Sequence, residues 1–187
     1  MTEVRQRLAY EPWTLADLES LPDDGNRYEI VDGSLLMSPA PPTDHQSVAS
    51  KLIALLDAAT PSGLRVTHGV GLLVEGEGET QYLIPDVLVV DHAVKGMQAY
   101  MPAQVHLVVE VVSPSSVTRD KVTKRNVYAR LGIPNYWIVE TTGPGRVTML
   151  TLDETGTYAE VQTVTGTQEF VAERPFAVRV AMDALLA

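Results

Sequence analysis

Two carboxylates stand in the most apolar part of the sequence, one in each of two neighbouring hydrophobic segments. Asp86 lies in QYLIPDVLVV (81–90) and Glu110 in VHLVVEVV (105–112). A carboxylate that is buried in its ionised form must be paired with a cation or bind a metal ion. A hard ion such as Mg²⁺ is commonly held by one or two carboxylates together with water and phosphate oxygens. The two acids are therefore candidates for a shared metal site, which can polarise a phosphate and activate a water molecule.

The two acids can share an ion only if their segments pair in one direction. Asp86 lies at the start of its predicted strand, and Glu110 lies near the end of the next. An antiparallel pair brings start and end together, whereas a parallel pair puts the acids at opposite ends. The site therefore requires an antiparallel pair. The alternative, in which each acid lies at a strand end and caps a turn, stays open at this point.

A charged helix is predicted over residues 116–131, directly after the second apolar segment. At about 100° per residue, Lys124 falls near the middle of its apolar face, where a lysine is least expected. A lysine there can point back toward the carboxylates and stabilise charge that develops on a phosphate, or orient the attacking water. An ion pair with Asp120, one turn earlier, is the alternative. The predicted apolar face comprises Val117, Asp120, Lys124, Val127, Tyr128 and Leu131.

The other predicted elements must hold these side chains in place. Both apolar segments are too hydrophobic to be exposed on either face, so each is predicted to be a central strand. A capping box of Thr43 and Gln46 predicts the start of a helix. The order predicts an α+β or mixed α/β fold with one central sheet. The further elements are a short helix after Thr14, a hairpin over 27–38 turning at Asp32-Gly33, a helix over 43–59, a strand over 65–76 bent at Gly69 or Gly71, a strand over 135–140, a hairpin over 146–164, and a strand with a helical turn after 176.

Length and composition bound the class of protein. The chain has 187 residues and no cysteine. We therefore expect one domain over 1–187, with 1–12 as a loose arm, and no disulfide or Cys-ligated metal. No signal peptide or membrane-spanning run is visible, which predicts a soluble, cytoplasmic protein without a membrane partner. The net charge of −10 argues against an extensive basic surface, although five of the 14 Lys and Arg residues fall in the helix 116–131.

Taken together, Pro85-Asp86, the segment EVVSP (110–114) and the helical Lys124 resemble the PD-(D/E)XK nuclease superfamily. Within it, the chain is similar to the Uma-two family of restriction-endonuclease-like proteins. The resemblance implies a mixed α/β fold with a central mixed sheet flanked by helices and extra hairpins at both ends. It also implies a Mg²⁺ or Mn²⁺ ion between Asp86 and Glu110, completed by the backbone carbonyl of Val111. Three further segments carry the likeness: 27–46, 120–128 and 132–139.

One position departs from the superfamily pattern. Val112 stands where the pattern has its lysine, two residues after the acid. The resemblance implies that the lysine has moved to the following helix, as Lys124. On this basis we expect a metal-dependent endonuclease that hydrolyses DNA, and a homodimer if both strands are cut. If the lysine has not moved, we expect the chain to bind metal without cutting. The alternative function is a non-catalytic module of the same fold that binds a protein or nucleic-acid partner.

Four further residues are candidates for supporting roles in the site. Glu29 lies in the predicted hairpin 27–38, and the superfamily often has an acid near its N-terminal end; an exposed strand glutamate is the alternative. His45 lies on the apolar face at the start of its predicted helix, where a packing histidine is the alternative. Tyr128 and Asp120 share the helical face of the lysine. For Tyr128, core packing with a solvated hydroxyl is the alternative.

Overall fold

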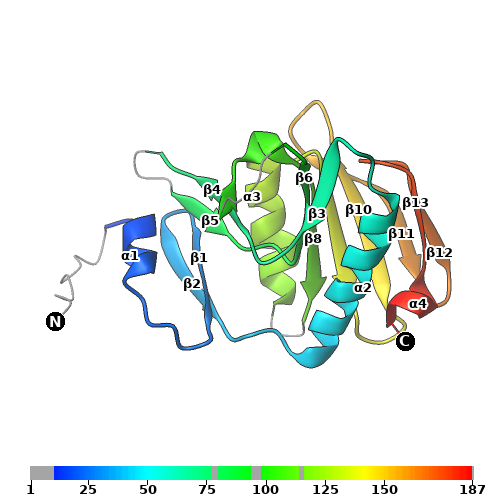
Figure 1. The fold of residues 1–187 in the computed structure, drawn as a ribbon, viewed down its shortest axis with the longest axis horizontal. Helices are drawn as coiled ribbons and strands as arrows, with labels where there is room; N and C mark the ends of the chain where they lie inside the picture. Colours follow the sequence, from blue (N-terminus) through cyan, green and yellow to red (C-terminus); the bar gives the residue numbers. More distant parts are fainter. Residues whose placement is uncertain (1–10, 77–79, 94–97, 114–115, 187) are drawn as a thin grey trace.

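The structure of the chain is a computed structural model, shown as a ribbon in Figure 1. Residues 1–10 of the predicted loose arm over 1–12 lie outside the described residues. The loop between the two apolar segments is described except at 94–97, and the motif EVVSP is described up to Ser113. The described residues are 11–76, 80–93, 98–113 and 116–186.

The two apolar segments form neighbouring strands inside a six-stranded sheet. Strands β6 (Val87–Asp91) and β8 (Val105–Val112) run antiparallel, with Val87 opposite Val109. Asp86 and Glu110 are the chain neighbours of Val87 and Val109. They therefore lie at the same end of the two strands, as the site requires. The order is β11-β10-β9-β8-β6-β3, and only β8 and β9 are parallel, so the sheet is mixed as expected. The other strands are β3 (Leu64–Thr67), β9 (Asn135–Glu140), β10 (Arg146–Leu152) and β11 (Tyr158–Thr165).

Alternate residues of these strands pack into two hydrophobic cores on opposite faces of the sheet. Along β6, Val87 and Val89 belong to one core, whereas Leu88 and Val90 belong to the other. Successive side chains of a strand point to opposite faces, so a strand covered on both faces must be apolar throughout. The continuous apolar runs of the sequence are thus explained by burial on both sides.

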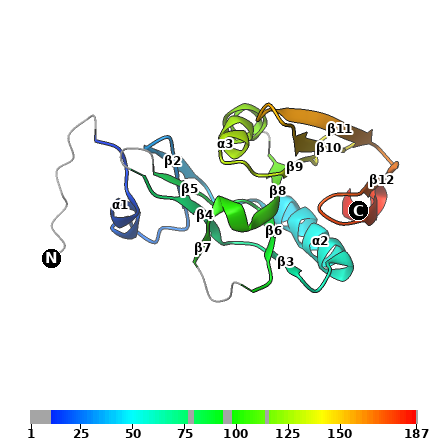
Figure 2. The same ribbon diagram turned by 90° about the horizontal axis from the view of Figure 1, so that it is seen from above.

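A helix covers each face of the sheet, as the view from above shows (Figure 2). Helix α2 (Thr43–Ala59) buries Leu52 in the first core. Helix α3 (Arg125–Arg130) buries Val127 and Tyr128 in the second core. The predicted fold class, a mixed sheet flanked by helices, is confirmed.

The helix predicted over 116–131 is not regular along its length. Residues Arg119–Lys124 form a π-helix, and α3 follows directly. A π turn closes its hydrogen bonds over one more residue than an α turn. The residues before the π turn therefore point to a different side of the helix than regular α-helical spacing predicts. Lys124 and Asp120 are buried as predicted, but Val117 is 40% exposed and does not belong to the apolar face.

A second, five-stranded sheet corrects the expectation of one central sheet; it lies to the left of the main sheet in Figure 1. The strand predicted over 65–76 is in fact two strands, β3 in the main sheet and β4 in the second. Between them Gly69 has a φ of +64°, which glycine adopts without steric strain. The strand order is β2-β1-β5-β4-β7. Their bounds are β1 (Arg27–Val31), β2 (Ser34–Ser38), β4 (Gly71–Val74), β5 (Gln81–Leu83) and β7 (Ala99–Tyr100).

Hairpins occur toward both ends of the chain, as expected. Strands β1 and β2 pair across Asp32 and Gly33, which both have positive φ, the backbone of a type I′ turn. Strands β10 and β11 form the second predicted hairpin. A further pair, β12 (Glu169–Ala172) and β13 (Val178–Ala181), was not fully predicted, and α4 (Met182–Leu186) follows it.

Helix α2 has the predicted bounds, but its N-terminal cap differs from the prediction. Pro42 is the N-cap and has no capping side chain, so the predicted capping box of Thr43 and Gln46 is wrong. The side-chain Nε2 atom of Gln46 donates instead to the carbonyl oxygen of Pro41, at 3.1 Å. The fixed φ of proline already suits a chain entering a helix, which lessens the need for a side-chain cap.

The remaining helices are short. Helix α1 (Leu15–Glu19) begins at the predicted place, after Thr14, and a 3₁₀ turn covers Pro102–Gln104. Within the described ranges, no helix is both long enough and apolar enough to cross a membrane.

Candidate active site

The chain crosses from the second sheet to the main sheet at Ile84-Pro85-Asp86, between β5 and β6, and strand β1 holds this crossing. The Oε1 atom of Glu29 accepts a hydrogen bond from the Ile84 N–H at 2.7 Å. The Nη1 atom of Arg27 donates to the Ile84 carbonyl at 3.3 Å and to Asp86 Oδ1 at 3.0 Å. Arg27 and Glu29 are two residues apart, so they project from the same face of β1. Asp86 is therefore placed by contacts from both sheets.

Asp86 is surrounded by cationic and N–H groups. Its Oδ1 atom is 3.0 Å from Arg27 Nη1 and 3.1 Å from His45 Nε2, and its Oδ2 atom accepts the Val111 N–H at 2.8 Å. Burial alone would raise the pKa of Asp86, but the hydrogen bond and charge of His45, the Val111 N–H and the charge of Arg27 together lower it to about 2. Asp86 is therefore ionised at neutral pH. Val111 contributes its N–H here, whereas the resemblance implies its carbonyl as a ligand.

Glu110 has the opposite electrostatic character. Its Oε1 atom accepts hydrogen bonds from Lys124 Nζ at 2.9 Å and from the Tyr128 hydroxyl at 2.6 Å. Burial, together with the charges of nearby carboxylates, outweighs the attraction of Lys124 and raises the pKa of Glu110 to about 8. The site thus holds more acid than its cations neutralise. The nearby carboxylates are Asp86, Asp120 and Glu29.

Lys124 is a buried cation shared between two strands. Only 1% of the residue is exposed, and its Nζ atom lies 2.9 Å from Glu29 Oε1 and 2.9 Å from Glu110 Oε1. Burial would lower the pKa of Lys124, but the neighbouring carboxylates outweigh it and raise the pKa above its ordinary range. Lys124 therefore stays charged at neutral pH, which suits a group that stabilises negative charge rather than one that removes a proton.

Asp120 lies beside this cluster on the π-helix. It is buried, its Oδ1 atom is 3.4 Å from Arg119 Nε, and burial raises its pKa. The alternative expectation was that Lys124 pairs with Asp120 across one helical turn. The structure instead pairs Lys124 with Glu29 from β1 and Glu110 from β8.

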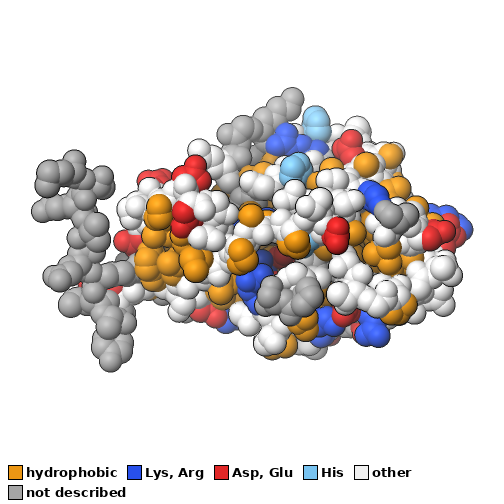
Figure 3. Space-filling view, turned by 90° about the horizontal axis from the view of Figure 1, so that it is seen from below, with side chains coloured by type: hydrophobic (Ala, Val, Ile, Leu, Met, Phe, Trp, Pro, Cys, Tyr) orange, Lys and Arg blue, Asp and Glu red, His pale blue; other side chains and the backbone are white. Residues whose placement is uncertain are grey.

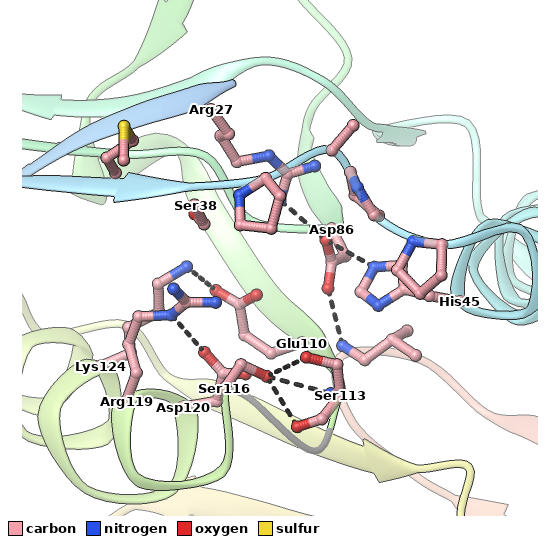
Figure 4. Close-up of a pocket in the computed structure, with 16 residues that line it drawn as sticks. Arg27, Ser38, His45, Asp86, Glu110, Ser113, Ser116, Arg119, Asp120 and Lys124 are labelled. Carbon is pink, nitrogen blue, oxygen red and sulfur yellow. Dashed lines mark hydrogen bonds and ion pairs between the residues drawn. The ribbon is translucent and has the colours of Figure 1, made fainter. Parts of the chain in front are cut away.

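These side chains line a cavity of about 430 Å³, drawn in Figure 4. Asp86 and Glu110 come from neighbouring strands of its floor, His45 reaches in from α2, and the segment Met37–Pro42 forms one wall. On the molecular face shown in Figure 3, Lys and Arg side chains are scattered among acidic and hydrophobic ones rather than gathered in a broad patch. The cavity itself is lined by three basic side chains, Arg27, Arg119 and Lys124.

The donor atoms of the cavity suit a hard divalent cation. Asp86 and Glu110 supply carboxylate oxygens from adjacent strands, and Asp120 lines the same cavity. Across the described part of the chain, no group of three or more His, Cys, Asp and Glu side chains is arranged to hold a metal ion by itself. An ion held by Asp86 and Glu110 would keep water or substrate oxygens in its remaining positions, as Mg²⁺ usually does.

The structure brings all the predicted site residues into one neighbourhood. Glu29 and Tyr128 lie behind the cavity wall, where they contact Lys124 and Glu110. Glu29 is buried, so the exposed-strand alternative is wrong for this residue. The residues that line the cavity are Asp86, Glu110, Val111, His45, Asp120 and Lys124.

Sequence reasoning missed two arginines of the cavity. Arg27 contacts Asp86 and Arg119 contacts Asp120. A signal existed for Arg27, because it stands two residues before Glu29 and must share its face of a strand. Nothing comparable distinguishes Arg119 from the other basic residues of its helix.

Comparisons with known proteins place this site in a family. The family model Uma2, described as "Putative restriction endonuclease", matches residues 15–184. The fold is similar to that of a solved structure from Anabaena variabilis ATCC 29413, titled a "putative nuclease belonging to DUF820". The TM-score is 0.71 at 15% sequence identity, over 94% of this chain and 98% of that chain. No curated protein matches the sequence. Since the Uma2 match covers nearly the whole chain, this protein belongs to the Uma2 family of restriction-endonuclease-like proteins.

Proposed function

We propose that the protein is a metal-dependent endonuclease that hydrolyses phosphodiester bonds of DNA with Mg²⁺ or Mn²⁺. The observation that carries this proposal is the convergence of Asp86 and Glu110, from adjacent antiparallel strands, in one cavity with a cation bonded to Glu110. Family membership supports the reaction class. The chemistry of the donor atoms supports the choice of metal.

Each residue has a definite part in the proposed reaction. Asp86 and Glu110 bind the ion, which when bound polarises a phosphate oxygen and lowers the pKa of a water molecule. Lys124 keeps its positive charge beside Glu110 and stabilises negative charge that develops on the phosphate. Tyr128 donates a hydrogen bond to Glu110 and fixes the orientation of this carboxylate. Glu29 holds Lys124 from the side of β1.

A plasmid-nicking assay tests the reaction directly. Purified protein incubated with supercoiled DNA and Mg²⁺ or Mn²⁺ is expected to produce open-circular and then linear DNA. A chelator is expected to abolish the conversion. Protein that leaves the plasmid intact with both metals, over a wide range of enzyme concentration, would contradict the proposal.

Metal binding is expected to become tighter as the pH rises toward about 8. The Glu110 carboxyl, whose pKa is raised to about 8, is protonated below that pH and must lose its proton before it binds a cation. Asp86 is already ionised and adds no pH dependence in this range. The affinity for Mn²⁺ should rise about tenfold per pH unit from pH 6 to 8 and then level off.

Isothermal titration calorimetry with Mn²⁺ measures this prediction. At pH 7 the measured heat of binding should vary with the ionisation enthalpy of the buffer, by the amount expected for about one released proton. At pH 9 the heat of binding should not vary with the buffer. An affinity that is equal at pH 6 and pH 9 would contradict the role given to Glu110.

A second function, a non-catalytic module of the same fold, is favoured by one observation. Val112 occupies the position of the superfamily's lysine, and Lys124 is engaged by Glu29 as well as by Glu110. The same calorimetry discriminates between the two functions. An absence of Mn²⁺ or Mg²⁺ binding at millimolar metal would favour the module.

A further inference from the structure

We propose that Arg27 competes with the metal ion for Asp86 and, once the ion displaces it, binds the phosphate of the substrate. Arg27 would thus occupy the site in the metal-free protein and recognise substrate only in the metal-bound one. The inference rests on the proposed function, because it requires a metal at Asp86.

The position of Arg27 suits both roles. Its Nη1 atom lies 3.0 Å from Asp86 Oδ1, and the same nitrogen is 3.3 Å from the Ile84 carbonyl oxygen. The side chain of Arg27 is 25% exposed, whereas that of Asp86 is only 4% exposed. Figure 4 shows the Arg27 side chain above Asp86, with a dashed line joining the two. Arg27 is therefore the more exposed member of this pair, and it lines the same cavity.

Arg27 must move, rather than lose its charge, when a cation binds Asp86. A divalent ion binds carboxylate oxygens at just over 2 Å, which brings two like charges to the same oxygen atom. Arginine cannot be deprotonated in a protein, so it cannot relieve this repulsion by releasing a proton. The guanidinium must therefore be displaced from Asp86 when the ion binds.

A displaced guanidinium at the cavity rim is well suited to a phosphate. Its planar, forked set of donors matches two phosphate oxygens, and it remains charged in any solution the protein tolerates. The chain has a net charge of −10, so its overall charge does not attract a phosphate. A phosphate that enters the cavity would have to be held by local cations such as Arg27.

A purely structural role makes a different prediction. Through Ile84 and Asp86, Arg27 also holds the crossing between the two sheets. If that were its whole role, its replacement would loosen Asp86 and weaken metal binding. Competition predicts the opposite sign, so the direction of the change in metal affinity separates the two roles.

The first test is Mn²⁺ calorimetry on the variant Arg27→Gln. Its affinity for Mn²⁺ is expected to be about tenfold tighter than that of the wild-type protein, which corresponds to one lost charge-assisted hydrogen bond of about 1.4 kcal/mol. The control is Arg119→Gln, which removes one positive charge from the same cavity but from Asp120 rather than Asp86. Its Mn²⁺ affinity is expected to change by less than about threefold. Equal tightening in both variants would overturn the competition.

The second test measures DNA affinity by fluorescence anisotropy of a labelled duplex, with Ca²⁺ in place of the catalytic metal to prevent cleavage. In the Ca²⁺-bound protein, Arg27→Gln should bind DNA about tenfold more weakly and lower the slope of log affinity against log salt by about 0.9, for one lost phosphate contact. In the chelator-treated protein, the same substitution should leave the slope unchanged. A slope that falls equally in both states would overturn the proposal.

Two safeguards keep the outcome decisive. If Arg27→Gln does not fold, Arg27→Lys keeps the charge but loses the fork, and we expect it to bind Mn²⁺ more tightly than the wild type. If the wild type binds Mn²⁺ and neither Arg27→Gln nor Arg27→Lys binds it more tightly than the wild type, the inference is wrong and the proposed function stands. If the wild type binds no Mn²⁺ at millimolar concentration, the proposed function itself fails.

Discussion

Replacing Lys124 with methionine is expected to lower the free energy of unfolding by about 3–5 kcal/mol at pH 7. The substitution keeps the length of the side chain but removes a cation that lies 2.9 Å from both Glu29 and Glu110. Glu29 would then be buried without this cation, and Glu110 would lose a buried hydrogen-bond donor, which together cost far more than an exposed ion pair contributes. Urea unfolding followed by circular dichroism measures the loss, provided that the slope against denaturant is unchanged.

The matched control is Lys121→Met, on the same π-helix. Lys121 pairs with Glu140 at 2.7 Å, but about a third of its side chain is exposed, so its loss should cost only about 0–1 kcal/mol. The double variant Glu29→Gln, Lys124→Met should recover part of the stability, because the Glu29 carboxylate is then no longer buried without its cation. Equal losses for Lys121→Met and Lys124→Met would show that Lys124 is not the central cation of the site.

If the proposed function holds, replacing Asp86 with asparagine is expected to reduce nicking by at least about 10³-fold, because the site would lose several kcal/mol of interaction with the proposed ion. Asparagine has nearly the same shape, so it still fits beside Arg27 and the Val111 N–H. Mn²⁺ calorimetry on the same variant should show a parallel loss of metal affinity. The nicking rate is measured with supercoiled plasmid under the conditions of the wild-type assay.

Asp91→Asn is the control for this substitution. Asp91 ends the same strand, β6, at the opposite end from Asp86, and pairs with His106 at 2.8 Å where its side chain is 42% exposed. Its replacement should change nicking by less than about twofold. Activity that survives both in Asp86→Ala and in Glu110→Ala would sink the assignment of the metal-binding pair.

The central part of the site could be predicted because it depends on short sequence segments and on the large energetic cost of burying a charge. Two apolar runs can be covered on both faces only inside a sheet, and the positions of Asp86 and Glu110 within them then depend on a single choice of direction. A lysine on a buried helical face requires an anionic partner, and Lys124 forms an ion pair with Glu110. Burial thus made both inferences possible without any knowledge of distant contacts.

The rest depended on contacts and backbone geometry that local patterns do not encode. A glycine within a strand pattern predicts a bend or bulge, as expected at Gly69 or Gly71, but it does not show that the chain leaves one sheet for another. The placement of Val117 failed because a regular helix was assumed where a π-helix begins. Arg27 was missed because its partner Asp86 is 59 residues away in the chain.

The crossing at Ile84-Pro85-Asp86 makes the site dependent on a hairpin near the start of the chain. Strand β1 holds this crossing through Arg27 and also supplies Glu29 to Lys124. Neither sheet can complete the site without the other, so catalytic competence and the docking of the two sheets become one cooperative event. A single proteolytic cut that frees this hairpin would silence any activity that relies on Asp86, even though β6, β8 and both flanking helices would remain intact.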